Sequence, residues 1–342
     1  MRPMRRLSAI LLLAVALGAR AEEEAAEPAP ARLDEANQQA ARNVVETFAR
    51  EGGQLTTRLK GLRKEDVIVV GGLFDFVQEI LVAFRCPHTV IRPADLEHVD
   101  LEPAHRKIVL LNCHLLDRHF PTRQPDRPRP AKEEAEADLE RVIKKAGLDG
   151  PTAPGKAIRE RFDEVKFFAG SDYSEAGLKR LGAAVKQGAW LYSTDWAVLA
   201  LEKALPGTVR WTGQTTYEEV IEVKPSSAGK RHSLLKGVFD DKVKPRWWIE
   251  TESYLFTVKG KHTRLVESRV LGARYHDNRN IVVLLEPGKG RALHALSHGY
   301  LQRGRSGDAT AMQRLLANYL VEKSLANRRA ELAEAAKTER KR

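Results

Sequence analysis

Residues 187–197 read QGAWLYSTDWA, and this stretch decides the fold. Ala189 to Ser193 is short and apolar, as a buried strand is, and Trp196 to Leu205 follows with the spacing of an amphipathic helix. A sharp strand-to-helix turn presents one side chain over the free N–H groups of the helix. The sequence predicts that Thr194 takes this elbow position and that Asp195 caps the helix, although both residue types are also common as plain caps.

Apolar runs before this stretch repeat the alternation of strand and helix. The expected strands are Val67 to Val70, Thr89 to Arg92 and Lys107 to Asn112, and the expected helices are Phe74 to Phe84 and Ser174 to Gln187. This order predicts an α/β fold, with a mostly parallel central sheet and helices on both faces. Gly71-Gly72 lacks the third glycine of a dinucleotide-binding loop, so we interpret the pair as a tight turn.

The second half of the chain is rich in strands. Several runs alternate in polarity, which predicts antiparallel strands added to the sheet. These runs are Glu218 to Val223, Tyr254 to Val258, Arg264 to Val270, Asn280 to Leu285 and Arg291 to Leu296. A closing helix is expected from Thr310 to Leu325, before a charged tail that frays.

The N-terminus has the pattern of a cleavable signal peptide. A basic start precedes an apolar run from Leu7 to Leu17 and the small-x-small sequence Ala19-Arg20-Ala21, so cleavage is expected after Ala21. The apolar run is shorter than the roughly 20 residues of a membrane span. The mature protein is therefore expected in the periplasm or outside the cell, with no transmembrane segment after cleavage.

The expected domain organisation is simple. Residues 22–32 form a linker, and residues 33–325 form one α/β domain with a polar insertion at about 117–160. Residues 326–342 form the charged tail. We interpret the insertion as a surface elaboration rather than a lid over the sheet edge.

The net charge excludes little, because much of it belongs to the signal peptide. Four arginines lie in residues 1–21, so the formal charge falls from +11 to +7 on cleavage. The remaining basic residues alternate with acidic ones and form no aromatic and basic repeat, so specific nucleic-acid binding is not expected. The expected partners are a polar small molecule or an envelope protein.

Neither a metal nor a cofactor is predicted. The two cysteines, Cys86 and Cys113, could form a disulfide in an exported protein or remain as buried thiols, and the sequence leaves both open. Cys113 and His114 follow a strand, yet adjacent residues point in opposite directions. His294 and His298 are four apart at the end of a strand, so they do not imitate a helical pair of zinc ligands.

Three segments resemble the class I glutamine amidotransferase-like superfamily, in particular its non-amidotransferase branch of trehalose-utilisation-like and related exported bacterial proteins. They are QGAWLYSTDWA, HSLLKGV at 232–238 and GKGRALHALSHGYLQ at 288–302. The resemblance covers roughly residues 67–320, apart from the insertion, and implies a flavodoxin-like fold.

The residues that true amidotransferases use are missing. Their G-x-C-x-G elbow would place Tyr192 and Trp196 at the glycines and Thr194 at the nucleophilic cysteine. Their H-P-E segment would retain His298 but put Gly299-Tyr300 in place of proline and glutamate. A threonine hydroxyl is a weak nucleophile without an oriented base, so glutamine hydrolysis by the thiol route is not expected.

Two functions remain. The favoured one is a protein that binds a polar ligand or a protein partner at the strand ends, because no complete catalytic constellation is visible. The candidate ligand-binding residues, besides the elbow residue Thr194, are Asn112, Cys113, Ser193, Trp196 and Ser297. The alternative is a hydrolase of an envelope carbohydrate or related polar substrate, with Asp195 and His298 as its acid and base. Trp247-Trp248 fits a sugar-binding surface or, more commonly, a core position.

Overall fold

The computed structural model describes residues 30–72, 75–114, 140, 144, 172–239, 246–250, 252–300 and 306–340. The expected signal peptide, most of the linker and nearly all of the insertion lie outside these residues. Within the described part of the chain, every helix is too short or too polar to cross a membrane.

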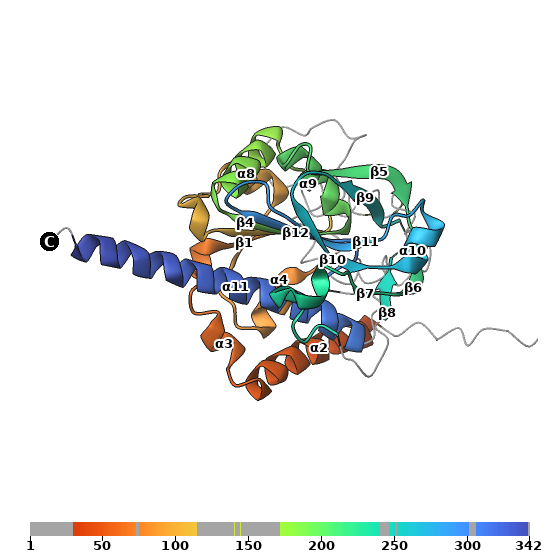
Figure 1. Cartoon of the computed structure of the whole chain (residues 1–342), viewed down its shortest axis with the longest axis horizontal. Helices are drawn as coiled ribbons and strands as arrows, with labels where there is room; N and C mark the ends of the chain where they lie inside the picture. The colour runs from red at the N-terminus through yellow and green to blue at the C-terminus, as the bar shows by residue number, and fades with distance from the viewer. Residues whose placement is uncertain are drawn as a thin grey trace, which may run out of the picture.

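An eight-stranded sheet forms the centre of the molecule, in the order β2-β1-β3-β4-β12-β11-β10-β7 (Figure 1). The first five strands are parallel, and the last three alternate in direction. The bounds are β1 (Val67–Val70), β2 (Thr89–Ile91), β3 (Ile108–Leu111), β4 (Trp190–Thr194), β7 (Lys224–Pro225), β10 (His262–Glu267), β11 (Asn280–Leu285) and β12 (Arg291–Ala295). Every residue of β1, β3 and β4 is buried, because helices cover both faces of a parallel sheet. The expected fold class is thus confirmed.

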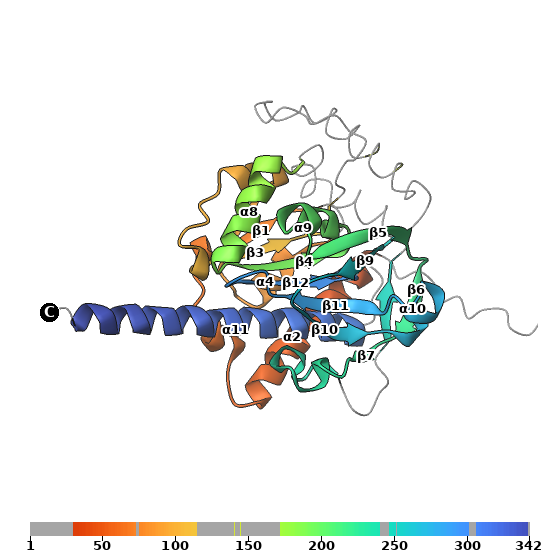
Figure 2. The ribbon, with the colours of Figure 1, turned by 45° about the horizontal axis from the view of Figure 1, so that its top comes forward.

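Helices cover both faces of the sheet (Figure 2). Helices α8 (Glu175–Gln187) and α9 (Val198–Ala204) lie on one face, and α2 (Pro30–Arg50), α4 (Val77–Ala83) and α11 (Ser306–Glu339) lie on the other. Short helices connect these elements: α3 (Leu55–Arg58) and the 3₁₀ turns η1 (Lys64–Asp66), η2 (Pro93–Glu97), η3 (Ala104–Arg106), η5 (Gly229–Arg231) and η6 (Ser233–Leu235).

Two antiparallel pairs lie beyond the antiparallel end of the sheet (Figure 1). They are β5 (Val209–Thr215) with β9 (Tyr254–Val258), and β6 (Glu219–Glu222) with β8 (Arg246–Ile249). Both tryptophans of β8 are buried, so they belong to the core rather than to a sugar-binding surface. The strand expected to reach Val270 ends at Glu267, because the Ser268 hydroxyl accepts the Leu271 N–H and so caps helix α10 (Arg269–Arg274).

The C-terminal helix is longer than the sequence predicted. Helix α11 continues to Glu339, where a fraying tail was expected. Its second half is held by specific contacts: the Asn327 amide donates to the backbone carbonyls of Gly61 and Arg106, and Glu331 pairs with Arg63 and Arg106. These polar contacts need no apolar periodicity, which is why the sequence pattern did not reveal them.

Lys323 of α11 offers a pH test of this packing. Its side chain is fully buried and donates to the His105 carbonyl over 2.6 Å. Burial lowers the pKa of Lys323 to about 7, opposed by the charge of Asp66 and assisted by that of Arg106. Between pH 7 and 9 the unfolded chain therefore binds more protons at this residue than the folded chain does, and stability rises with pH.

We expect the free energy of unfolding of the wild type to rise by about 2 kcal/mol between pH 7 and 9, relative to Lys323→Met. Urea unfolding at the two pH values measures it. The exposed Lys337→Met on the same helix is the control and should track the wild type. A rise of equal size in Lys323→Met would contradict the prediction.

Candidate functional site

Five ionisable side chains gather where the strands end. Asp75 follows β1, Cys113 follows β3, Asp195 follows β4, His298 follows β12 and Glu250 follows β8. The carboxyl ends of parallel strands meet at one edge of a sheet, which brings residues 224 positions apart into contact. All five are buried, with between 0% and 7% of their surface exposed. We call these five residues the strand-end cluster.

Asp195 occupies the elbow, one residue later than predicted. Thr194 is the last residue of β4 and has an extended backbone (φ −127°), whereas Asp195 has φ +43° and opens the turn η4 (Asp195–Ala197) that leads into α9. A positive φ is strained for a residue with a Cβ, and such strain persists only where the surrounding structure imposes it. The assignment of Thr194 to the elbow is therefore corrected.

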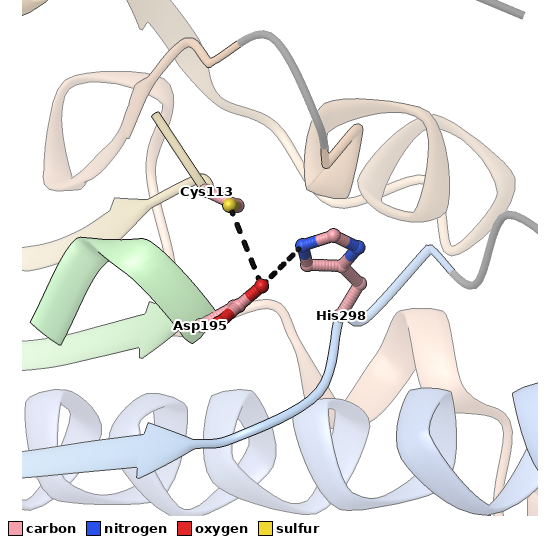
Figure 3. A group of neighbouring side chains, drawn as sticks. All are labelled: Cys113, Asp195 and His298. Atoms are coloured by element: carbon pink, nitrogen blue, oxygen red, sulfur yellow. Dashed lines mark hydrogen bonds and ion pairs between the residues drawn. The ribbon is translucent and has the colours of Figure 1, made fainter. Parts of the chain in front are cut away.

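The side chain of Asp195 points at Cys113 and His298 (Figure 3). Its Oδ2 atom lies 3.4 Å from Nε2 of His298 and accepts a contact from the Cys113 thiol over 3.9 Å. Its Oδ1 atom accepts the backbone N–H of Tyr254 over 3.0 Å. One carboxylate oxygen is thus used by the backbone, and the other faces the thiol and the imidazole.

Glu250 lies on the other side of the His298 ring. Its Oε1 atom is 3.1 Å from Nδ1 of His298, while Oε2 lies 3.2 Å from the Ser297 hydroxyl. The same hydroxyl donates to the Trp248 carbonyl over 2.9 Å, which fixes the end of β12 against β8. His298 is therefore held between two carboxylates, one on each ring nitrogen.

Asp75 anchors the ends of three strands. Its carboxylate accepts the Thr194 hydroxyl over 2.7 Å, and the backbone N–H groups of Phe76, Gly299 and Tyr300 over 2.9–3.1 Å. These donors follow β1, end β4 and follow β12. A buried carboxylate that accepts four hydrogen bonds fixes those strand ends relative to each other.

Burial sets the protonation of the cluster. It raises the pKa of Asp195 to about 6 and, with the charge of Asp195, that of the Cys113 thiol to about 12. It also raises the pKa of Asp75, against the pull of His298 and the four hydrogen bonds. Burial alone would lower the pKa of His298, but Glu250, Cys113 and Asp195 outweigh it and raise that pKa well above its usual value. At neutral pH the centre is an imidazolium between carboxylates.

The other predicted site residues have structural contacts. The Asn112 amide oxygen accepts the N–H of Val77 at the start of α4, and the Trp196 indole donates to the Glu252 carbonyl. Ser193 contacts Nδ1 of His294, a buried histidine whose pKa burial lowers to about 3. Both cysteines are free and buried, so the disulfide left open by the sequence is not formed.

Two members of the cluster were not predicted from the sequence. Asp75 follows a buried strand and a glycine pair, a position that could have marked it. Glu250 follows β8, a strand that was itself missed. The glycine pair was also misjudged: Gly72 has no positive φ, and the reason for it is that a Cβ there would lie 2.3 Å from the Cys113 carbonyl oxygen.

Comparisons with known proteins were made at three levels. No protein-family model matches the sequence, and no curated protein matches it. Among solved structures, one similar chain is a Thermoplasma acidophilum protein provisionally assigned to GMP synthase, as one of its subunits. It has 8% identity and a TM-score of 0.40, and the match covers 79% of this chain and 97% of that one.

A glutamine amidotransferase from Thermotoga maritima is similar at 11% identity and a TM-score of 0.38, over 77% of this chain and 98% of that one. A cold-adapted β-galactosidase from Rahnella sp. R3 is similar at 12% identity and a TM-score of 0.35, over 73% of this chain and 30% of that one. Likeness at this level carries no conclusion about activity.

Proposed function

We propose that this protein is an exported, non-amidotransferase member of the glutamine amidotransferase-like superfamily that binds a polar ligand or a protein partner at the strand-end cluster without glutaminase activity. The observation that carries the proposal is the residue at the elbow. Asp195 stands there, fixed by Tyr254 and facing His298. A carboxylate at this position cannot form the thioester that a thiol nucleophile would form with glutamine.

Cys113 does not replace the missing nucleophile. It follows β3 rather than β4, and its thiol contacts the Asp195 carboxylate. A catalytic thiol needs a base that takes its proton and a neighbouring oxyanion site, whereas here the nearest acceptor is the elbow residue itself. The dense polar contacts of the cluster support binding and positioning rather than acyl transfer.

The alternative of a carbohydrate hydrolase has less support. Its acid and base would be Asp195 and His298, which contact each other and are 2% and 3% exposed. Tyr300 and Trp196 beside them are also buried, and Tyr300 packs edge-on against Phe76. An acid–base pair must reach a shared substrate, and these two side chains use their reach on one another.

One experiment tests export and binding together. The full-length chain is expressed in a bacterial host and recovered from the periplasm or the medium, where its intact mass should correspond to a chain beginning at Glu22. This mature protein is screened by thermal shift against amino acids, mono- and disaccharides and muramyl peptides, and is assayed for ammonia release from glutamine. Asp195→Ala and His298→Ala are screened in parallel.

We expect no ammonia, and stabilisation by one compound class in the wild type that is lost in both variants. At 100-fold excess over its dissociation constant, a ligand should contribute about 2.7 kcal/mol. Glutamine turnover would overturn the proposal. So would a compound that stabilises all three proteins equally, or the absence of any hit when both variants are folded and as stable as the wild type.

A further inference from the structure

The part of the strand-end cluster around Asp195 has the composition of a metal site. Cys113, Asp195 and His298 each offer one ligand atom, and these three atoms lie within 4.8 Å of one another. The three residues come from the ends of three different strands, β3, β4 and β12, which are held by the sheet. A rigid, converging arrangement of thiol, carboxylate and imidazole is what zinc sites use.

The distances between the ligand atoms fit a tetrahedral zinc ion. With Zn–N, Zn–O and Zn–S bonds of about 2.0, 2.1 and 2.3 Å, tetrahedral geometry places nitrogen and oxygen about 3.4 Å apart, and sulfur and oxygen about 3.6 Å apart. The protein has 3.4 Å between Nε2 of His298 and Oδ2 of Asp195, and 3.9 Å between Sγ of Cys113 and the same oxygen. Side-chain shifts of a few tenths of an ångström complete the match.

The surroundings orient each ligand. The Tyr254 N–H occupies Oδ1 of Asp195 and leaves Oδ2 for the metal. Glu250 lies 3.1 Å from Nδ1 of His298, so the proton belongs on Nδ1 and the lone pair on Nε2, as in the carboxylate–histidine–zinc arrangement. Within the described residues, both ring nitrogens of this buried histidine lack a well-directed hydrogen bond, which a ligand on Nε2 would supply.

We propose that Cys113, Asp195 and His298 bind one Zn²⁺ ion, with Glu250 orienting His298 from behind. Binding releases the thiol proton and the Nε2 proton to solvent, so the two ligand anions neutralise the ion. Sulfur favours zinc over magnesium or calcium. Three protein ligands leave the fourth position for water or a ligand atom. The zinc proposal does not depend on the polar ligand proposed above, because the test uses the metal alone.

The test uses tag-free mature protein that has been stripped with a chelator and dialysed. Zinc is titrated by calorimetry and counted by elemental analysis, and Co²⁺ is used as a spectroscopic probe. We expect one zinc per chain, and a cobalt spectrum with a sulfur-to-metal charge-transfer band in the near ultraviolet. Cys113→Ser should abolish that band and, like Asp195→Ala and His298→Ala, weaken zinc binding more than about 100-fold.

Two further variants sharpen the assignment. Glu250→Gln should weaken zinc binding about 10- to 100-fold, as loss of an orienting carboxylate does. Cys86→Ser removes the other buried cysteine, which lies outside the cluster, and should keep the wild-type affinity and spectrum. Circular dichroism checks that each variant is folded.

A measurement on the wild type alone keeps the proposal falsifiable if the variants misfold. The zinc X-ray absorption spectrum should show one sulfur and two or three nitrogen or oxygen atoms around the ion. A wild type that takes up no stoichiometric zinc, a shell without sulfur, or loss of binding in a folded Cys86→Ser would overturn the proposal.

Discussion

Asp75→Ala is expected to lower the free energy of unfolding by about 4 kcal/mol, because it leaves a group of buried donors without an acceptor. Three of those donors are backbone N–H groups, and the fourth is the Thr194 hydroxyl. Asp75 has no exposed surface, so water cannot easily take the place of the carboxylate. Urea unfolding at pH 7 measures the loss.

A graded series separates the contributions. Thr194→Val removes one donor and leaves the carboxylate with three backbone partners, so we expect a loss of about 1 kcal/mol. Asp75→Asn keeps the shape but offers one acceptor oxygen and turns an NH₂ group toward other donors, so we expect a loss of about 2 kcal/mol. Asp100→Ala is the matched control, because its exposed carboxylate also accepts a backbone N–H, and it should cost under about 1 kcal/mol. An Asp75→Ala protein as stable as this control would contradict the prediction.

The parallel half of the fold could be predicted from the sequence because its signal is local. Buried parallel strands are continuous apolar runs, and each of β1, β3 and β4 lies within one residue of its expected bounds. Strands β5 and β8 were missed for the same reason in reverse. β5 reads VRWTGQT and is largely exposed, and β8 is only four residues long, so neither has a clear alternation.

The site was predictable only in part. Asp195 and His298 follow strands that pattern analysis found, so their meeting follows from the topology. Glu250 follows a strand that pattern analysis missed, and the exact elbow residue depends on a single backbone dihedral that composition does not encode. The metal-ligand geometry combines three residues more than 80 positions apart, and spacing rules for zinc apply to ligands that are close in sequence.

Gly72→Ala is expected to destabilise the protein by about 3 kcal/mol. An added Cβ would lie 2.3 Å from the Cys113 carbonyl oxygen and 2.8 Å from the Asn112 Cβ, and neither atom can move without shifting the end of β3. Reduced freedom of the unfolded chain would favour alanine by less than about 1 kcal/mol. The overlap therefore determines the sign of the effect. Urea unfolding measures the change.

Gly53→Ala is the matched control. Gly53 also lacks a positive φ, but its added Cβ would meet only the guanidinium end of Arg58, at 3.0 Å, and that flexible side chain can move aside. We therefore expect a change of less than about 0.5 kcal/mol there. Equal effects at both glycines would show that the end of β3 yields easily. The close approach of Gly72 to the Cys113 carbonyl would then not be what fixes the thiol opposite Asp195, and a rigid position for Cys113 would need another cause.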